Sequence, residues 1–324
     1  MTKAIVIEQT GGPEVMQWVK YPLPELQAGQ ACIRHTAIGF NMIDTYMRKG
    51  LYPVPLPMVP GVEAAGVVTA VAANVDNVKV GDRVVYMTRT PGCYAQQRVV
   101  DSQLLVKLPD AISDEVAVAA FLKGLTTWAL LTRTYAVQPT DTILVYAAAG
   151  GLGSIMCQWG CALGARVIGV VGSHSKVQPA LDSGCDQVLV RTEDDIVSRV
   201  RELTGGVGVQ VVYDSLGQQT FASSLDCIAP LGTMVSFGNA TGAVEPFNIL
   251  TLAQKGSLML ARPQVYAYVE KREDLERGAA EVFSRIISAD IKIGIGARYP
   301  LEQAAEAHRL AESGVTMGST VLLP

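Results

Sequence analysis

A glycine-rich segment, Ala147–Gly153, has the residue types and spacing that most clearly indicate chemistry. Compared with the G-x-G-x-x-G pattern of dinucleotide-binding proteins, it has alanine at the first glycine position, Ala148. The second glycine would let the backbone approach a pyrophosphate, and the third would let a helix pack closely on the preceding strand. The free N–H groups at the start of that helix attract anions. The residues predicted to contact a dinucleotide here are Gly150, Gly151, Leu152 and Gly153.

The residues after the next predicted strand distinguish between the two nicotinamide dinucleotides. An NAD enzyme usually has Asp or Glu about 20 residues beyond the glycines, where it binds the ribose 2′-hydroxyl. Here Gly172 and Ser173 stand at that place, since 173 − 153 = 20, and no carboxylate would repel a 2′-phosphate. Ser173 can donate a hydrogen bond, Lys176 supplies charge, and Arg191 could close over the phosphate or stack on the adenine. The alternative is that both cations are solvated surface residues. The sequence favours NADPH.

Two patterns of secondary structure would position these residues. Residues 1–120 combine β-branched alternation with Gly and Pro punctuation, which predicts a compact β-barrel-like domain. From about residue 125, apolar strands alternate with helix-length segments, which predicts a parallel sheet with helices on both faces. The predicted strands are 142–147, 166–170, 187–190, 209–213 and 232–237, and the predicted helices are 151–163, 175–183, 193–203 and 218–228.

The tail after residue 262 departs from this alternation. It is too short to build its own core, so we expect it to return to the first domain. It is predicted to hold one helix, within 299–308, and a terminal strand at 320–323. The predicted domains are therefore residues 1–124 with 263–324, and residues 125–262.

Composition narrows the class of protein. Of the 324 residues, 49% are hydrophobic and 17% are charged, so the chain can bury large cores. Its net charge of −4 disfavours nucleic acid or an anionic membrane as a partner, because phosphate binding requires clustered Lys and Arg. No secretory signal is visible, and no apolar run reaches the roughly 18 residues of a membrane span. The six scattered cysteines suit a reducing cytoplasm.

Other motifs run along the whole chain: Gly11–Val15, Asn41–Tyr46, Pro60–Val68, Gly81–Val84, Leu122–Thr126 and Phe237–Asn239. Together with the glycine segment they resemble the medium-chain dehydrogenase/reductases, in particular their zinc-free quinone oxidoreductase (zeta-crystallin-like) branch. The resemblance implies an α/β protein with a GroES-like β-barrel catalytic domain and a doubly wound Rossmann domain. It also implies NADPH-dependent reduction of small quinones in the cleft between them.

Comparison with the zinc-dependent relatives predicts that this chain binds no metal. They have a cysteine ligand where this chain has Asn41, and a histidine ligand where it has Val62. Catalytic zinc needs three strong ligands and an open position, which these residues do not provide. The four closely spaced cysteines of the relatives' structural-zinc lobe are missing too, because no cysteine lies between Cys93 and Cys157. Without a Lewis acid, an already electrophilic quinone is a better acceptor than an ordinary carbonyl.

The resemblance also implies roles for individual residues. Asn41 would bind the acceptor oxygen or the nicotinamide ribose, Asp44 would orient its neighbours, and Tyr46 or Tyr52 would donate the proton that follows hydride. The alternatives are that Asn41 is only a helix cap and that Tyr52 is only a half-buried wall residue. Thr126 and Pro263 could instead serve helix-start and turn chemistry. The other cofactor contacts implied are Asn41, Lys123, Thr126, Ser215, Phe237, Gly238, Asn239, Arg262 and Pro263.

Two other functions remain open at this stage. Proteins of the same branch reduce the carbon–carbon double bond of an enal, enone or enoyl thioester, and a tyrosine such as Tyr46 would then supply the proton. Relatives also serve as lens crystallins or bind RNA, but the acidic balance and the absence of a basic–aromatic stripe count against RNA. The apolar segment 257–261 could be an edge strand that pairs with its copy to make a homodimer.

Overall fold

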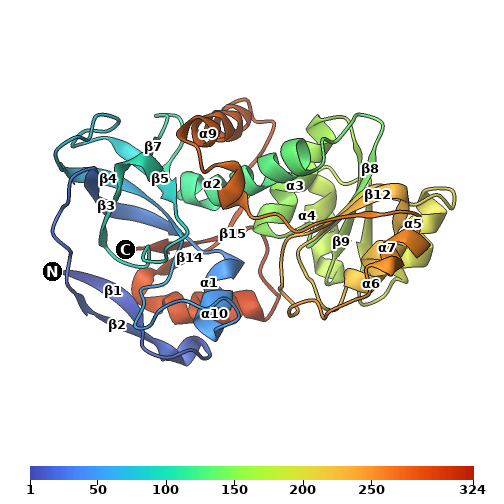
Figure 1. The fold of residues 1–324 in the computed structure, drawn as a ribbon, viewed down its shortest axis with the longest axis horizontal. Helices are drawn as coiled ribbons and strands as arrows, with labels where there is room; N and C mark the ends of the chain where they lie inside the picture. The colour runs from blue at the N-terminus through green and yellow to red at the C-terminus, as the bar shows by residue number, and fades with distance from the viewer. The chain divides into compact units, whose positions relative to one another are not determined.

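The contacts within the chain divide it into two units (Figure 1). The computed structural model describes residues 1–324. The first unit comprises residues 1–123, 269–287 and 293–324, and the second comprises residues 124–268 and 288–292.

The first unit is built mainly of antiparallel strands. A two-stranded sheet pairs β1 with β2, and a larger sheet has the strand order β14-β15-β3-β4-β5-β7, with β6 pairing β3. Its helices are α1 (Met42–Lys49), most of α2 (Asp114–Trp128), α9 (Arg272–Ile287) and α10 (Ala304–Glu312). Its strands are β1 (Thr2–Ile7), β2 (Met16–Tyr21), β3 (Gln30–Gly39), β4 (Glu63–Val71), β5 (Arg83–Met87), β6 (Gln97–Asp101), β7 (Val106–Lys107), β14 (Ile295–Pro300) and β15 (Ser319–Leu323).

The core of the first unit explains why the tail packs there. Alternating residues of β3 and β4, such as Ile33 and Val68, bury one face of the sheet, as a half-buried antiparallel strand requires. Leu301, Ala307 and Leu322 from the tail belong to the same buried cluster. The apolar faces of α10 and β15 are therefore covered by strands from the start of the chain.

The expectation of a single helix in the tail is wrong. The structure has α8 (Val265–Tyr268), α9 and α10 there, as well as β14. In α9 the buried residues are Leu275, Gly278, Ala279, Val282 and Phe283, which recur at helical spacing. Charged residues fill the positions between them, so the apolar stripe is narrow and does not stand out in the sequence.

The second unit is a parallel sheet with helices on both faces, as the sequence predicts. Its strand order is β10-β9-β8-β11-β12-β13, and every pair is parallel. Figure 1 shows α3 and α4 on one side of this sheet and α5, α6 and α7 on the other. The strands are β8 (Thr142–Tyr146), β9 (Arg166–Val171), β10 (Gln187–Val190), β11 (Val209–Asp214), β12 (Ile228–Ser236) and β13 (Met259–Ala261). The helices are α3 (Gly151–Ala162), α4 (Val177–Asp182), α5 (Ile196–Leu203), α6 (Phe221–Asp226) and α7 (Leu250–Gln254).

The largest boundary error concerns α6 and β12. The helix predicted over 218–228 is shorter, and the strand predicted from 232 begins at Ile228. Leu231 continues the strand with a φ of 64°, a conformation that large L-residues rarely adopt. Pro230 and Gly232 flank it and look like turn punctuation, which hides the start of the strand.

One helical stretch, Asp114–Thr134, is long and apolar enough to cross a membrane by length and composition. It comprises α2 and a short π-helix, Ala129–Thr134. Of its most apolar 18-residue window, 72% is buried inside the protein. The core helix of a soluble protein meets the same criteria of length and composition. The uncharged residues of this stretch form two shorter runs in the sequence, 116–122 and 124–132, because Lys123 interrupts them.

Candidate functional site

The residues implied for the acceptor end lie around the start of α1. Asn41 is the N-cap residue of this helix, so the alternative reading of it as a cap is correct as far as position goes. The amide nitrogen of its side chain also donates to Glu63 Oε2 at 2.9 Å and to the carbonyl oxygen of Gly39 at 3.3 Å. Its backbone N–H donates to Asp44 Oδ2 at 3.0 Å. The cap therefore fixes the orientation of both Asn41 and Asp44.

Asp44 is fully buried and incompletely hydrogen-bonded. Its Oδ2 also accepts from the hydroxyl of Tyr94 at 3.1 Å, whereas Oδ1 has no hydrogen-bond partner. Burial raises the pKa of Asp44 to about 7, although the hydrogen bonds from Asn41 and Tyr94 act to lower it. A carboxyl group with such a pKa can exchange a proton near neutral pH.

Two further buried ionisable groups flank Asn41. Glu63 is completely buried and accepts from the backbone N–H of Leu122 at 2.6 Å in addition to Asn41. Lys123 Nζ lies 4.0 Å from Glu63 Oε2 and donates to the carbonyl oxygen of Phe40 at 3.2 Å. Burial raises the pKa of Glu63 and lowers that of Lys123, while each group's charge acts to offset the shift of the other. Lys123 therefore does lie next to Asn41, in a weakly hydrated environment.

The two candidate tyrosines contact each other edge to face. The ring centroids of Tyr46 and Tyr52 are 5.4 Å apart, with the planes at 73°. Tyr46 is 8% exposed and Tyr52 is half-buried. The edge-to-face pair leaves part of Tyr52 accessible, which fits both the donor role and the alternative of a wall residue.

In the second unit, the glycine segment connects the end of β8 to the start of α3. Ala147 leaves the strand with a φ of 54°, and Gly150 is the N-cap residue of the helix with no side chain capping its N–H groups. A Cβ atom added at Gly153 would lie 2.1 Å from the carbonyl oxygen of Ala147, so only glycine fits this approach. The helix N-terminus is thus left open to an anion.

The residues implied for the 2′-phosphate follow β9 and β10. Ser173 precedes a 3-10 helix, His174–Lys176, and its hydroxyl lies 3.0 Å from that of Ser175. Burial lowers the pKa of Lys176. Arg191 donates to Gln219 Oε1 at 3.1 Å, which ties its guanidinium to the turn between β11 and α6. The carboxyl ends of parallel strands share one edge of a sheet, so these residues and the glycine segment lie along the same edge.

Asp214, at the end of β11, orders the next part of this edge. Its Oδ1 accepts from the N–H groups of Leu216 and Gly217, at 2.7 and 3.0 Å, and its Oδ2 accepts from two hydroxyl groups of α6 and the turn before it. The turn that carries Ser215 is thereby fixed. A Cβ atom at Gly238 would lie 2.2 Å from the carbonyl oxygen of Ser215, so the segment Phe237–Asn239 packs directly on that turn.

The remaining predicted residues are placed as follows. Arg262 follows β13 and donates to the carbonyl oxygen of Ser236 at 2.8 Å, which brings it beside the end of β12. Pro263 lies between β13 and α8, where turn chemistry remains an adequate explanation. Thr126 lies near the C-terminal end of α2, so the alternative that it starts a helix is wrong. Lys123 belongs to the first unit and Thr126 to the second, although both are in α2.

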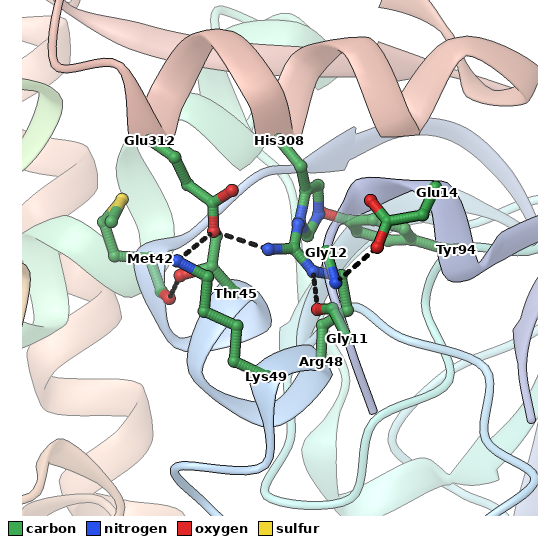
Figure 2. A network of polar contacts seen from close by, with 10 residues as sticks. All are labelled: Gly11, Gly12, Glu14, Met42, Thr45, Arg48, Lys49, Tyr94, His308 and Glu312. Carbon is green, nitrogen blue, oxygen red and sulfur yellow. Dashed lines mark hydrogen bonds and ion pairs between the residues drawn. The ribbon is translucent and has the colours of Figure 1, made fainter. Parts of the chain in front are cut away.

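The buried polar groups of the first unit include four residues that no sequence pattern predicts as site residues: Arg48, Glu63, Tyr94 and His308. Figure 2 shows Arg48 on α1 beside His308 on α10. These two residues lie 260 positions apart in the sequence. Only Glu63 had a local signal, as an acid within the apolar stretch Pro60–Val68. The others look like ordinary helix or loop residues, because their partners are distant in sequence.

Comparisons with known proteins agree with this arrangement. The profile described as alcohol dehydrogenase GroES-like domain matches residues 27–110, and that described as zinc-binding dehydrogenase matches residues 151–282. The chain is similar to a quinone oxidoreductase of Salmonella typhimurium, 49% identical over 327 residues with all of both chains covered. It is also similar to a 2-haloacrylate reductase of a Burkholderia species, 39% identical with 100% of this chain and 99% of that protein covered. The crystal structure of Escherichia coli quinone oxidoreductase complexed with NADPH superposes with a TM-score of 0.98, at 46% identity over 99% of this chain and all of that one.

The description of one matching profile raises the question of zinc. In this structure no group of three or more His, Cys, Asp or Glu side chains could hold a metal ion. At the start of α1 the available side chains are the Asn41 amide, which donates to Glu63, and the apolar Val62. This donor set does not fit catalytic zinc. That the protein works without metal remains a prediction.

Proposed function

Because the chain belongs to the quinone oxidoreductase family of the medium-chain dehydrogenase/reductases, we propose that it is an NADPH-dependent quinone reductase that needs no metal ion. The observation that carries the proposal is the edge of the second unit's sheet. There the uncapped N-terminus of α3 lies along the same edge as Ser173 and Lys176, and no carboxylate stands at the ribose position. The E. coli structure titled as a complex with NADPH, with a TM-score of 0.98, supports this choice of cofactor.

The second unit holds and orients the cofactor in this proposal. The N–H groups at Gly151–Gly153 bind the pyrophosphate, and Ser173, Lys176 and Arg191 bind the 2′-phosphate. The turns at Ser215 and at Phe237–Asn239, with Arg262 and Pro263, line the rest of the edge. The bound nicotinamide supplies a hydride, which converts a quinone to its hydroquinone together with one proton.

The first unit handles the acceptor. Asn41, held by Glu63, hydrogen-bonds the acceptor oxygen or the nicotinamide ribose, and Lys123 and Thr126 lie at the nicotinamide end. Tyr46 and Tyr52 offer phenol groups that can stack on a flat ring and donate a proton. The division into a catalytic domain of residues 1–124 and 263–324 and a cofactor domain of residues 125–262 belongs to this proposal. It is supported by two compact units with similar bounds.

A second candidate function is reduction of a conjugated carbon–carbon double bond. It is favoured by the 2-haloacrylate reductase, which is 39% identical over the full chain. The same hydride would then reach carbon, and Tyr46 would deliver the proton to the neighbouring carbon. Three relatives named quinone oxidoreductase are more similar, at 46–49% identity, so quinone reduction is preferred.

An acceptor panel tests the two functions against each other. NADPH oxidation is measured with 1,4-benzoquinone, 2-chloroacrylate and a crotonyl thioester, and then repeated with NADH. We expect kcat/KM to be at least about tenfold higher for the quinone than for either alkene. We also expect it to be about tenfold higher with NADPH than with NADH, because one charge-assisted hydrogen bond to the 2′-phosphate contributes about 1.5 kcal/mol or more. A higher kcat/KM for an alkene than for the quinone would contradict quinone reduction and support reduction of a carbon–carbon double bond.

The proposal includes a cytoplasmic homodimer. At the edge of the sheet, β13 exposes Met259 and Leu260, at 54% and 38%, and pairs with β12 on one side only. Pairing with a second copy would cover these apolar residues and the open edge. The six cysteines form no disulfide, which suits a reducing compartment. Light scattering coupled to size-exclusion chromatography should give twice the 34.4 kDa chain mass, and a monomer at all concentrations would exclude the dimer.

A further inference from the structure

A chain of hydrogen bonds runs through the interior of the first unit and ends on Asp44. Arg48 Nη1 lies 3.0 Å from His308 Nδ1, His308 Nε2 lies 3.1 Å from the hydroxyl of Tyr94, and that hydroxyl donates to Asp44 Oδ2 at 3.1 Å. Figure 2 shows His308 between Arg48 and Tyr94. Arg48 and His308 are completely buried, as are Tyr94 and Asp44.

The chemistry of arginine fixes the direction of every bond in this chain. A guanidinium only donates, so His308 Nδ1 must accept and carries no proton. Burial, together with the charge of Arg48, lowers the pKa of His308 to about 3, so the ring is neutral and its proton sits on Nε2. That N–H donates to Tyr94, whose own hydroxyl proton is then directed to Asp44. The donations therefore run in one direction, from Arg48 through His308 and Tyr94 to Asp44 Oδ2.

The consequence concerns which oxygen of Asp44 can carry a proton. Oδ2 already accepts from Tyr94 and from the backbone N–H of Asn41, so a proton there would face two donors and weaken both bonds. Oδ1 has no partner and is free to be protonated. The hydrogen bonds to Oδ2 thus confine the titrating proton of Asp44 to Oδ1.

Other groups around Asp44 set how firmly it holds this proton. Besides burial, Glu63 on β4 raises the pKa of Asp44, and Lys123 on α2 lowers it. Asn41 and Tyr94 lower it through hydrogen bonds. The thiol of Cys93 is close enough for its own pKa to be affected by Asp44. Arg48 on α1 and His308 on α10 complete the surroundings, and both act through Tyr94.

We propose that Asp44 stores on Oδ1 the proton consumed in quinone reduction, and that Tyr94 and His308 are positioning residues that keep it off Oδ2. This inference rests on the proposed function. Reduction of a quinone Q follows Q + H⁻ + H⁺ → QH₂, so each hydride requires one proton. Tyr46 or Tyr52 donates a proton as the phenolic O–H of the product forms, the proton held by Asp44 replaces it, and Asp44 takes up another from solvent before the next turnover.

Removing the Tyr94 hydroxyl tests the inference. The hydrogen bond from Tyr94 stabilises ionised Asp44, so Tyr94→Phe raises its pKa. If protonated Asp44 is the active form, kcat/KM falls as pH rises through this pKa, and the fall moves to higher pH by roughly one unit in the variant. Tyr86→Phe is the matched control. It also removes a buried tyrosine hydroxyl that contacts a histidine, His35, at 2.8 Å, but it should leave the pH profile in place.

Infrared difference spectroscopy between pH 5 and pH 9 gives a readout that needs no turnover. We expect a protonated-carboxyl band that titrates near neutral pH, is missing in Asp44→Asn and titrates about one unit higher in Tyr94→Phe. If the band shifts but the kcat/KM profile does not, Asp44 is not the proton store, while quinone reduction stands. If the band is absent from the wild-type protein, the inference is wrong even where Tyr94→Phe fails to fold. If the wild-type protein reduces no quinone, the proposed function is wrong. The proton on Asp44 then has no role in quinone reduction, although the titration of the Asp44 carboxyl band can still be observed.

Discussion

Replacing Gly153 with alanine should raise the dissociation constant for NADPH at least 100-fold. The added Cβ would lie 2.1 Å from the carbonyl oxygen of Ala147, 2.8 Å from its carbonyl carbon and 2.9 Å from the Cα atom of Ala148. All three are backbone atoms, so no side-chain rotation relieves the clash, and the start of α3 must move away from the end of β8. The N–H groups that bind the pyrophosphate move with it. A 100-fold loss corresponds to about 2.7 kcal/mol, the size expected when several such contacts are displaced. Titration of NADPH fluorescence measures the effect.

Gly294→Ala is the control for this substitution. A Cβ atom at Gly294 meets nothing within 4 Å and its φ is not in the left-handed region, so the variant should bind NADPH like the parent protein. Thermal unfolding of Gly153→Ala shows whether a folded second unit remains. A folded Gly153→Ala variant with unchanged affinity would show that the glycine segment does not hold the pyrophosphate.

Replacing Arg48 with methionine should lower the free energy of unfolding by about 3–5 kcal/mol, because a fully buried guanidinium would lose its hydrogen bonds, one of them to the partly buried carboxylate of Glu312. The Arg48 side chain has no exposed surface and donates to the carbonyl oxygen of Gly11, to His308 and to Glu312, at 3.1, 3.0 and 2.5 Å. Methionine keeps the apolar volume but leaves the buried ring nitrogen of His308 without its donor, and it leaves Lys49 as the remaining cation beside Glu312. Urea unfolding followed by circular dichroism measures the loss.

Lys49→Met removes the other cation that pairs with Glu312. Lys49 Nζ lies 2.9 Å from the same carboxylate, but its side chain is 53% exposed. Solvent screens such pairs, so this variant should lose less than about 1 kcal/mol. Equal losses in the two variants would mean that the buried contacts of Arg48 add nothing to stability.

The cofactor half of the protein could be predicted largely from the sequence. Strands of the second unit are buried on both faces, so they appear as short apolar runs, and β10 was predicted with its observed bounds, Gln187–Val190. The glycine segment carries its own information, because Gly153 is required by a neighbour only six positions away, Ala147. In the glycine segment, the sequence motif and the close approach of Gly153 to Ala147 therefore indicate the same turn.

The acceptor half could be predicted less well, and for a physical reason. The partners of Asp44 include Tyr94, 50 positions away, and beyond it His308, a further 214 positions along the chain. No periodicity or spacing links such residues, since they meet only after α10 packs beside α1. The family resemblance implies that Asp44 orients its neighbours. The structure adds the hydrogen bonds that Asp44 accepts from Asn41 and Tyr94.

The most direct test of the account is reduction of 1,4-benzoquinone by protein from which metal has been stripped. The protein is treated with a strong chelator and dialysed, its metal content is determined by mass spectrometry, and NADPH binding and oxidation are then measured. We predict that less than a tenth of an equivalent of metal remains, on the order of contamination, with tight NADPH binding and full turnover. Activity that disappears with the chelator and returns with stoichiometric zinc, or a protein that binds no NADPH, would contradict it.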